Sequence, residues 1–236
     1  MKAILMAAGM GTRISEKTNN PKCLLDIGNG PLIAHTVDLL TRHQIDVTIC
    51  LGYKGECIKE ALANYPVTYY ENPFYKVTNS IASLWFARDM MDSDEDILFA
   101  NADVFWQEDI LKLLTNDSRD VVLLGDVSRK LTGDYFFTVS NERLLAYGKE
   151  LLEEERTCEY VGLAKISASF LPAMKQRLMR LVKEGDYQLW WENTLYSMIK
   201  ERDIYVKDVQ DCYWSEIDVI ADYESILNYV SLHGNK

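Results

Sequence analysis

The sequence predicts an α/β domain in which a mostly parallel central sheet is flanked by helices. Three observations lead to this fold class. The chain has 236 residues, and 48% of them are apolar, which is enough for one sizeable core. Up to Gly125, apolar strand-like segments alternate with amphipathic ones, as in successive strand-helix-strand units. After Gly125 the apolar segments become shorter and are separated by polar turns, which indicates an antiparallel or mixed extension of the sheet.

The first half of the chain alternates expected strands and helices. The strands expected here are Lys2–Ala7, Val47–Leu51, Val67–Tyr70, Ile97–Ala100 and Val121–Gly125. The helices expected between them are Leu32–His43, Ile58–Asn64 and Ser80–Met91. Apolar residues at helical spacing support the last helix most clearly, and Asn79 or Ser80 is available to cap its first turn.

The second half contains shorter strands and longer helices. The strands expected here are Tyr135–Val139, Leu144–Tyr147, Val161–Ile166 and Ile204–Val209. The helices expected here are Leu171–Lys183, Leu189–Lys200 and about Val219–Leu232. Gly185 stands where a helix commonly ends in a left-handed residue. Because no repeat or low-complexity linker interrupts the chain, residues 1–236 are expected to form one domain, with at most a sub-region boundary near Gly125.

The composition excludes several classes of protein. The formal net charge is −11, and no block rich in lysine and arginine interrupts the acidic background, which argues against nucleic-acid binding. The longest apolar runs are strand-sized, so neither a membrane-spanning helix nor a signal peptide is expected. Five cysteines without a Cys-x-x-Cys pair indicate reduced thiols in a cytoplasmic protein rather than disulfides or a zinc site. None of the three histidines adjoins a nucleophile motif, which argues against a triad hydrolase.

A glycine-rich turn directly follows the first expected strand. Its sequence is Ala7-Ala8-Gly9-Met10-Gly11-Thr12-Arg13, and Lys22 follows nine residues later. Turns of this kind let backbone N–H groups approach phosphate oxygens. The turn is neither the dinucleotide fingerprint, because Ile14 replaces the third glycine, nor a Walker loop. Two cations beside it, Arg13 and Lys22, favour a nucleoside triphosphate that is attacked at its α-phosphorus, although a plain turn with two surface cations is the alternative.

Two aspartates are candidate magnesium ligands. Asp103 follows the expected strand Ile97–Ala100, at the sheet edge where ligands of open α/β sheets gather. Asp218 comes just before the last expected helix. Mg²⁺ is usually bound by one or two protein carboxylates together with substrate phosphates, so this pair could be sufficient. Each aspartate could instead cap a helix.

These motifs resemble the signature of the nucleotidyltransferases that make nucleoside-diphosphate sugars and related compounds. Residues 3–25, from the first strand through Pro21-Lys22-Cys23-Leu24-Leu25, carry the resemblance. It implies a Rossmann-like sheet of the nucleotide-diphospho-sugar transferase type, and Mg²⁺ as cofactor. The residues it implies around the nucleotide are Ala8, Gly9, Gly11, Thr12, Arg13 and Lys22, with Asp103 and Asp218 as the metal ligands. No protein nucleophile or base is required, because an incoming phosphate oxygen is already ionised at neutral pH.

Aromatic residues beside acids mark the second half of the chain. The segment Tyr187–Asn193 contains two tryptophans and Glu192, and Gly133-Asp134-Tyr135 adds another aromatic next to an acid. Aromatic faces with a carboxylate select organic cations. The helical spacing expected here turns Trp191 toward the core and leaves Trp190 as the better ligand candidate. The alternative is that all these aromatics only pack the core.

This pattern resembles one branch of the family, the bacterial choline-phosphate cytidylyltransferases. The segments that carry this resemblance are the glycine turn, Asn72–Tyr75, Thr78–Ser80, Ser83-Leu84, Asp103, Trp191–Asn193 and Glu216–Asp218. It implies CTP as the donor and Asn79 and Ser83 near the nucleotide. It also implies Tyr135, Trp190 or Trp191, and Glu192 near a cationic acceptor head.

The sequence departs from that branch at three positions. Tyr135 replaces an expected tryptophan, and Glu192 replaces an aspartate. Lys165 is more similar to the aminoalkylphosphonate or sugar-phosphate enzymes, in which a lysine holds the acceptor phosphate; an exposed lysine on an edge strand is the alternative. These departures weaken the case for phosphocholine as the acceptor, but they do not weaken the case for a small phosphorylated acceptor.

The expected reaction is Mg²⁺-dependent transfer from CTP to a small phosphorylated or phosphonate acceptor, with release of pyrophosphate, for cell-surface decoration. Residues 1–125 would bind the nucleotide and residues 126–236 the acceptor, with no membrane insertion and with a homodimer compatible with the sequence. The alternatives are a sugar-1-phosphate nucleotidyltransferase that uses UTP or dTTP, and a non-catalytic nucleotide-binding regulator. A retaining glycosyltransferase is less favoured, because Asn101 stands where an Asp-x-Asp pair would begin.

Overall fold

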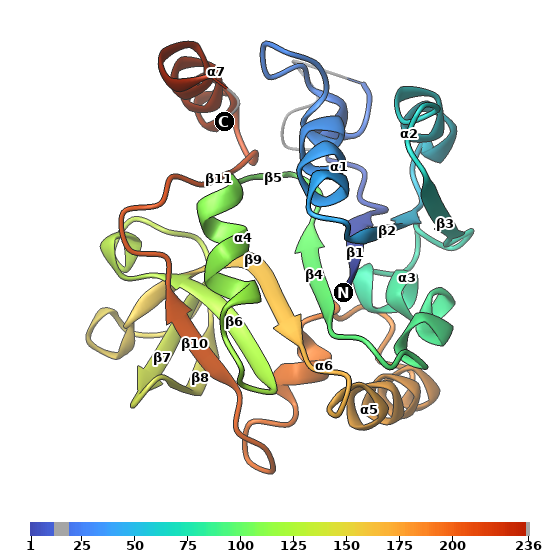
Figure 1. The fold of residues 1–236 in the computed structure, drawn as a ribbon. Coiled ribbons are helices and arrows are strands. Elements are labelled where there is room, and N and C mark those ends of the chain that lie inside the picture. Colours follow the sequence, from blue (N-terminus) through green and yellow to red (C-terminus); the bar gives the residue numbers. More distant parts are fainter. Residues whose placement is uncertain (12–18, 235–236) are drawn as a thin grey trace.

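A mixed sheet of nine strands forms the centre of the part of the chain that the structure, a computed structural model, describes: residues 1–11 and 19–234. The strands are β1 (Lys2–Ala7), β2 (Asp46–Leu51), β3 (Val67–Glu71), β4 (Ile97–Asn101), β6 (Val121–Asp126), β7 (Phe136–Ser140), β8 (Arg143–Gly148), β9 (Cys158–Ile166) and β10 (Tyr205–Asp208). Their order across the sheet is β3-β2-β1-β4-β9-β6-β10-β8-β7 (Figure 1).

The strands of the first half pair as expected. β1 lies between β2 and β4, and β2 also pairs with β3, all in parallel. Each expected strand up to Gly125 is present, with ends within one residue of the expected ones. Because β1 and β4 are parallel neighbours, the glycine turn and Asp103 leave the sheet at the same edge. The predicted fold class is confirmed.

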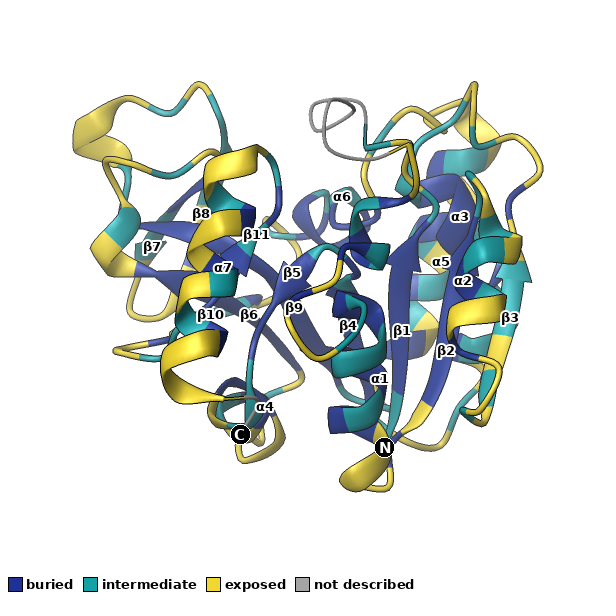
Figure 2. Ribbon diagram, turned by 90° about the horizontal axis from the view of Figure 1, so that it is seen from above, coloured by how far each residue is buried: buried dark blue, intermediate teal, exposed yellow. Residues whose placement is uncertain are grey.

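Helices cover both faces of the sheet. Their bounds are α1 (Leu32–Arg42), α2 (Gly55–Ala61), α3 (Ser80–Phe86), α4 (Glu108–Thr115), α5 (Leu171–Glu184), α6 (Asn193–Tyr196) and α7 (Ile220–His233). The apolar sides of α1, α2 and α4 share one core with the sheet, and those of α3, α5 and α6 share the other. Figure 2 shows the central strands β1, β4 and β9 buried, while the outward sides of the helices are exposed.

The second half of the sheet closes on itself. β9 pairs antiparallel with both β4 and β6, and its first residues also pair with β7. Since β6 pairs with β10, β10 with β8, and β8 with β7, these strands form a closed ring with β9. The expected antiparallel or mixed extension is confirmed, whereas the boundary near Gly125 stays a prediction.

Two short strands outside the main sheet were not expected. β5 (Val104–Phe105) pairs antiparallel with β11 (Ser215–Glu216), which joins the segment after β4 to the segment before α7. Helix α4 was not expected either. Single turns of 3₁₀ helix lie at Lys22–Leu24, Arg88–Met91, Val127–Arg129 and Glu153–Glu155. The helix expected over Ser80–Met91 therefore ends at Phe86 and continues as a 3₁₀ turn.

The helix expected over Leu189–Lys200 is largely wrong, because only α6 is helical. The preceding segment bonds to the start of α3 instead of to itself. The backbone N–H of Asn79 donates to the Tyr187 carbonyl, that of Ile81 to the Leu189 carbonyl, and that of Trp191 to the Ser80 hydroxyl. Those contacts hold residues 187–191 along the first turn of α3.

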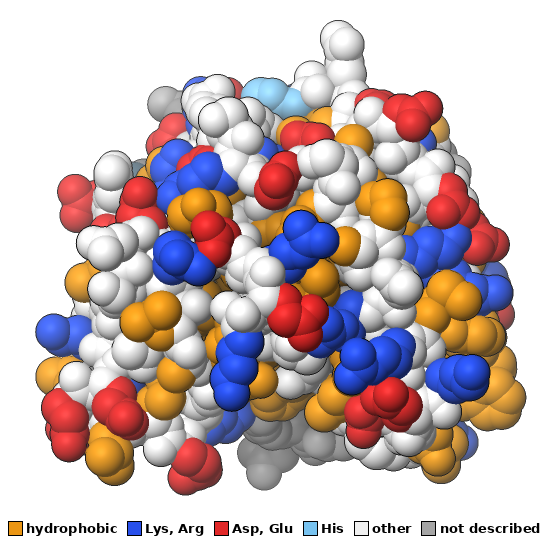
Figure 3. Space-filling view, turned by 90° about the horizontal axis from the view of Figure 1, so that it is seen from below, with side chains coloured by type: hydrophobic (Ala, Val, Ile, Leu, Met, Phe, Trp, Pro, Cys, Tyr) orange, Lys and Arg blue, Asp and Glu red, His pale blue; other side chains and the backbone are white. Residues whose placement is uncertain are grey.

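The outer surface carries charges of both signs. On the face drawn in Figure 3, lysine and arginine side chains are interspersed with acidic and apolar ones. All five cysteines are free thiols, as expected. None of the helices within residues 1–11 and 19–234 is long and apolar enough to cross a membrane.

Candidate active site

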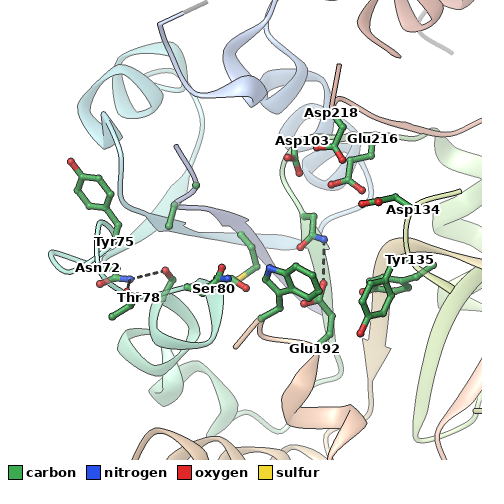
Figure 4. A pocket seen from close by; sticks show the side chains of 18 of the residues that line it. Asn72, Tyr75, Thr78, Ser80, Asp103, Asp134, Tyr135, Glu192, Glu216 and Asp218 are labelled. Carbon is green, nitrogen blue, oxygen red and sulfur yellow. Dashed lines mark hydrogen bonds between the residues drawn. The ribbon is translucent and has the colours of Figure 1, made fainter. Parts of the chain in front are cut away.

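A cavity of about 270 Å³ lies at the carboxyl ends of β1 and β4. Three groups of side chains surround it in Figure 4. Asn72, Tyr75, Thr78 and Ser80 lie on one side, and Asp103, Glu216 and Asp218 gather at what we call the carboxylate end. Tyr135 and Glu192 lie at what we call the aromatic end. The lining residues Tyr160, Trp190 and Tyr196 belong to the same end, through the ring contacts that join them to Tyr135. The cavity therefore draws on both halves of the chain.

The glycine turn adjoins the carboxylate end. Ala8 and Gly9 line the cavity, and a smaller adjacent cavity of about 100 Å³ is lined by Gly9, Gly11 and Lys22 among others. Gly11 has φ +60°, and a Cβ there would lie 2.8 Å from Cγ of Lys22, so this position requires glycine. Thr12 and Arg13, expected to contact the nucleotide, lie outside the described residues.

The carboxylate end is organised around the Lys22 ammonium. Its Nζ lies 2.5 Å from Oδ1 of Asp218 and 3.6 Å from Oδ2 of Asp103. Burial alone would lower the pKa of Lys22, but the two aspartates raise it above its ordinary value. Burial also raises the pKa of Glu216, and the neighbouring negative charges of Asp103 and Asp218 add to this effect. The three expected residues Lys22, Asp103 and Asp218 thus meet in one charge cluster.

The pairing of β5 with β11 brings the two aspartates together. Glu216 lies opposite Val104, and the backbone N–H of Ile217 donates to the Asp103 carbonyl at 3.0 Å. Neither aspartate caps a helix. Asp103 lies between β4 and β5, and the start of α7 is capped by the Asp222 carboxylate, which accepts from the N–H groups of Asp218 and Val219. The helix-cap alternatives are therefore wrong, and both side chains face the cavity.

The donor set at the carboxylate end fits Mg²⁺. Both aspartates already face one positively charged group, the Lys22 ammonium. In the described part of the chain, no group of three or more carboxylate, histidine or cysteine side chains could hold a metal by itself. Mg²⁺ takes hard oxygen ligands and commonly combines one or two carboxylates with substrate phosphates. Two aspartates beside a phosphate-binding turn meet that requirement.

Asn79 and Ser83, which the resemblance places near the nucleotide, line the cavity on the same side as Asn72 and Thr78. Asn79 is the N-cap of α3. Ser83 is buried, and its hydroxyl accepts a hydrogen bond from Nδ2 of Asn72 at 3.0 Å. Nδ2 of Asn72 also donates to Thr78, so one buried amide ties the segment after β3 to α3. Polar groups on this side are thereby held in place.

The aromatic end surrounds one buried acid. Glu192 is 5% exposed, and its Oε1 accepts from Nδ2 of Asn101 at 3.2 Å. Burial raises the pKa of Glu192 to about 7. Among the described residues, no lysine or arginine forms an ion pair with it. Tyr135 and Trp190 meet edge to face nearby, with ring centroids 5.4 Å apart.

The two tryptophans have different environments. Trp191 is fully buried, stacks on Phe99 at 5.2 Å and donates from Nε1 to Oδ1 of Asn101. It is not among the residues that line the cavity. Trp190 is 40% exposed and does line it. The division expected from the sequence is confirmed, but its cause is the contact of residues 187–191 with α3 and not helical spacing.

Lys165 does not reach the cavity. The register of β9 pairs it with Leu98 and Val122, near the amino ends of β4 and β6, and Leu98 precedes Asn101 by three residues, or roughly 10 Å. It is 2% exposed, and its ammonium donates to the Asp117 carbonyl. The expected contact with an acceptor is therefore corrected, and so is the alternative of an exposed lysine on an edge strand.

Lys149 lines the cavity but was not predicted from the sequence. Lys149 forms an ion pair with Asp134, and its Nζ lies 5.8 Å from the centre of the Trp190 ring. It follows β8, whose pairing with β7 places Gly148 opposite Phe136. Recognising that hairpin register would have placed Lys149 next to Tyr135. Tyr160 and Tyr196 were also missed, because they lie in buried segments with no local motif, and Asn101 was considered only as a departure from an Asp-x-Asp pair.

Arg129 connects the two ends of the cavity from behind. Its guanidinium donates to the Trp214 carbonyl at 2.6 Å and lies 3.4 Å from the Asp126 carboxylate and 3.9 Å from that of Glu159. Glu159 in turn accepts from the backbone N–H of Asp134. One partly buried network thus joins the segment leading to β11 and the segment leading to Tyr135.

Fold and site together define a class of protein. A glycine turn, a lysine and two aspartates converge at the strand ends of a mixed nine-stranded sheet, within the described residues, and this arrangement is that of a nucleotidyltransferase. The chain belongs to the family of MobA-like NTP transferase domains, whose sequence model matches residues 3–177. The family expected from the glycine turn is confirmed.

Individual relatives cover nearly the whole chain. The CTP:phosphoglutamine cytidylyltransferase of Campylobacter jejuni is 26% identical, over 95% of this chain and 98% of its own. The choline-phosphate cytidylyltransferase of Streptococcus pneumoniae is 27% identical, over 96% of each chain. The 2-aminoethylphosphonate cytidylyltransferase of Lancefieldella rimae is 27% identical, over 93% of this chain and 89% of its own.

A solved structure shares the fold. The CTP:phosphocholine cytidylyltransferase of Streptococcus pneumoniae superposes with a TM-score of 0.79 at 22% identity, covering 97% of this chain and 98% of that one. The sheet described above is therefore a nucleotide-diphospho-sugar transferase fold, as expected.

Proposed function

We propose that the protein is a Mg²⁺-dependent cytidylyltransferase that joins CTP to a small phosphorylated or phosphonate acceptor with a cationic head, and releases pyrophosphate. The observation that carries this proposal is one cavity with two different ends. Lys22, Asp103 and Asp218 meet at the carboxylate end, where we place the phosphate and metal site, and Glu192 has a carboxyl without an ion-pair partner among the described residues at the other end. The names of the three relatives support CTP as the donor.

At the carboxylate end, the chain binds and aligns the triphosphate. Asp103 and Asp218 would hold the metal ion, which when bound neutralises phosphate charge. The backbone amides of the glycine turn and the Lys22 ammonium donate to phosphate oxygens, and Arg13 is proposed to do the same. An acceptor oxygen then attacks the α-phosphorus in line, the bond to the leaving pyrophosphate breaks, and no general base is needed.

At the aromatic end, the chain positions the acceptor. Glu192 attracts the cationic head, and Tyr135 and Trp190 supply ring surface beside it. Lys149 takes the role first assigned to Lys165, that of a cation for the acceptor phosphate, because it lines the cavity and Lys165 does not. A cytoplasmic location and a part in cell-surface decoration belong to the same proposal, and the homodimer stays a prediction.

A screen of pyrophosphate release tests the proposal. CTP, UTP and dTTP are each combined with phosphocholine, phosphoethanolamine, aminoethylphosphonate and glucose-1-phosphate, with Mg²⁺ and with EDTA. We expect turnover with CTP and an amine-bearing acceptor, and no turnover with EDTA. Preference for glucose-1-phosphate with UTP or dTTP would support a sugar-1-phosphate enzyme instead. Nucleotide binding without product would support the regulator, and nucleotide affinity unchanged by EDTA would contradict the metal site.

A further inference from the structure

Three buried polar side chains meet the cavity at its aromatic end. Glu192, Tyr160 and Tyr196 are 5%, 8% and 2% exposed, and all three line the cavity. The hydroxyl of Tyr196 has no hydrogen-bond partner among the described residues, and that of Tyr160 has no partner there other than the Glu192 carboxyl. A buried hydroxyl without a partner is destabilising, and native proteins rarely leave one so unless a ligand or water completes it. The unpaired Tyr196 hydroxyl, with Tyr160 and one carboxyl beside it, indicates a ligand that donates hydrogen bonds.

The aromatic faces, by contrast, are largely used by the protein itself. Tyr196 stacks on Tyr147 at 4.4 Å and on Tyr135 at 6.0 Å, and Tyr160 packs against Phe137 at 5.2 Å. At 2% and 8% exposure, neither Tyr196 nor Tyr160 has an open ring face. These tyrosines therefore offer hydroxyl oxygens to the cavity rather than ring surface.

The two rings proposed to lie beside the acceptor head, those of Tyr135 and Trp190, are already in contact with other groups of the protein. The ammonium of Lys149 lies 5.8 Å from the centre of the Trp190 ring, and Tyr135 meets the same ring edge to face. A quaternary ammonium is bound by several open aromatic faces and cannot donate a hydrogen bond. A primary ammonium has three N–H donors, and Glu192, Tyr160 and Tyr196 provide three acceptors.

We propose that the acceptor is a phosphorylated or phosphonate primary amine, whose –NH₃⁺ group is bound by the Glu192 carboxylate and the Tyr160 and Tyr196 hydroxyls, and not a quaternary ammonium. This inference rests on the proposed function and narrows it to one class of acceptor. Replacing the N–H donors by methyl groups would leave the buried hydroxyls unpaired and crowd the carboxylate. Sites that hydrogen-bond a substrate group strongly reject analogues that lack it.

A methylation series tests the proposal. Pyrophosphate release from CTP with Mg²⁺ is measured for phosphoethanolamine, its N-methyl and N,N-dimethyl forms, and phosphocholine. We expect kcat/KM to fall along the series by at least about tenfold in total, mainly through KM. Equal or better use of phosphocholine would overturn the amine proposal while leaving cytidylyl transfer standing.

Three variants separate hydrogen bonding from packing. Tyr160→Phe and Tyr196→Phe should raise KM for phosphoethanolamine and leave KM for phosphocholine nearly unchanged. The preference for phosphoethanolamine over phosphocholine, measured as the ratio of their kcat/KM values, should therefore decrease. The control is Tyr147→Phe, since Tyr147 stacks on Tyr196 but does not line the cavity, and this variant should keep the wild-type preference. An unchanged preference in both Tyr160→Phe and Tyr196→Phe would contradict the proposal.

Direct binding distinguishes failure of this inference from failure of the proposed function. Calorimetric titration with phosphoethanolamine and phosphocholine requires no turnover. Tighter binding of the primary amine without pyrophosphate release would contradict the transfer reaction alone. Equal binding of phosphoethanolamine and phosphocholine, or binding of neither, would contradict the amine proposal.

Discussion

The two ends of the cavity differ in whether a cationic side chain lies beside their acidic groups. At the carboxylate end, Asp103 and Asp218 share the Lys22 ammonium, which is itself held by those two acids. At the aromatic end, Glu192 accepts a hydrogen bond from Asn101, and no cationic side chain of the described residues pairs with it. The carboxylate end is therefore partly compensated by the chain, since one ammonium faces the carboxyl groups of Asp103, Glu216 and Asp218, whereas the aromatic end has only a ligand to compensate it.

This difference shows which part of the site depends on the substrate. A buried carboxyl without a cation is costly in its ionised form, and its pKa rises so that it stays partly neutral. The chain retains this unfavourable group where a packed apolar side chain would be more stable. Retaining it is understandable if a cationic acceptor supplies the missing charge during each reaction cycle. Four substitutions test this difference between the two ends of the cavity.

The largest effect on kcat is expected at the carboxylate end. Asp103→Asn removes one of the two carboxylates that would hold the metal, while Lys22 keeps Asp218 as a partner. We expect kcat with CTP and the best acceptor to fall by roughly 10²- to 10³-fold, with the melting temperature little changed. The matched control is Asp109→Asn, at an exposed position on α4, which should retain wild-type kcat. A kcat within twofold of wild type for Asp103→Asn would remove this residue from the mechanism.

The second variant, Glu192→Gln, changes the aromatic end. Glu192→Gln keeps the shape and the oxygen that accepts from Asn101, but removes the charge. We expect KM for an amine-bearing acceptor to rise by about tenfold or more, with KM for CTP unchanged. The same variant should melt at a higher temperature at pH 8, since it removes a buried charge. A lower melting temperature together with an unchanged acceptor KM would contradict this account.

The pH dependence follows from the same group. With a folded pKa of about 7, above the ordinary value of 4.5, Glu192 favours folding when neutral. That stability is fully present below about pH 4.5 and is lost as pH rises through 7, by up to about 3 kcal/mol. Binding of the cationic acceptor runs the other way, so its KM should fall as pH rises through 7. The acceptor phosphate titrates in the same way with wild-type protein and with Glu192→Gln, so the difference between the two proteins isolates the effect of Glu192. Parallel pH profiles of the acceptor KM for the two proteins would be inconsistent with titration of Glu192.

The smallest effect separates two lysines. Lys149→Met should raise the acceptor KM by about two- to tenfold, because Lys149 lines the cavity next to Asp134. Lys165→Met should leave KM for both substrates unchanged, whatever it does to stability, because Lys165 is held near the amino ends of β4 and β6. Steady-state kinetics of the two variants side by side would show the reverse order if the sequence-based assignment of Lys165 were right.

The sequence predicted features that depend on local order along the chain. Buried parallel strands and a glycine turn at a strand end are local, so β1, β4 and the position of Asp103 followed directly. The meeting of Asp103 with Asp218 required the β5–β11 pairing, in which each strand is only two residues long. Such short strands have no periodicity to detect.

The aromatic end was predicted less well for a related reason. Residues 189–191 were expected to begin a helix, because their spacing suited one, but backbone bonds between residues 187–189 and the start of α3 hold this segment in another conformation. Lys165 was expected at the site because a lysine near the family pattern was available, yet the register of β9 places it elsewhere. Tyr160 and Tyr196 became visible only through burial and missing partners.

The central claim, that the aromatic end awaits a cation from the acceptor, is tested most directly by two acceptors of equal length. Phosphoethanolamine and propyl phosphate differ in having an ammonium or a methyl group at the same position. Pyrophosphate release from CTP at pH 8 should give wild-type protein a kcat/KM at least about tenfold higher with phosphoethanolamine, and Glu192→Gln should lose that preference. Equal kcat/KM for the two acceptors with wild-type protein would contradict the claim.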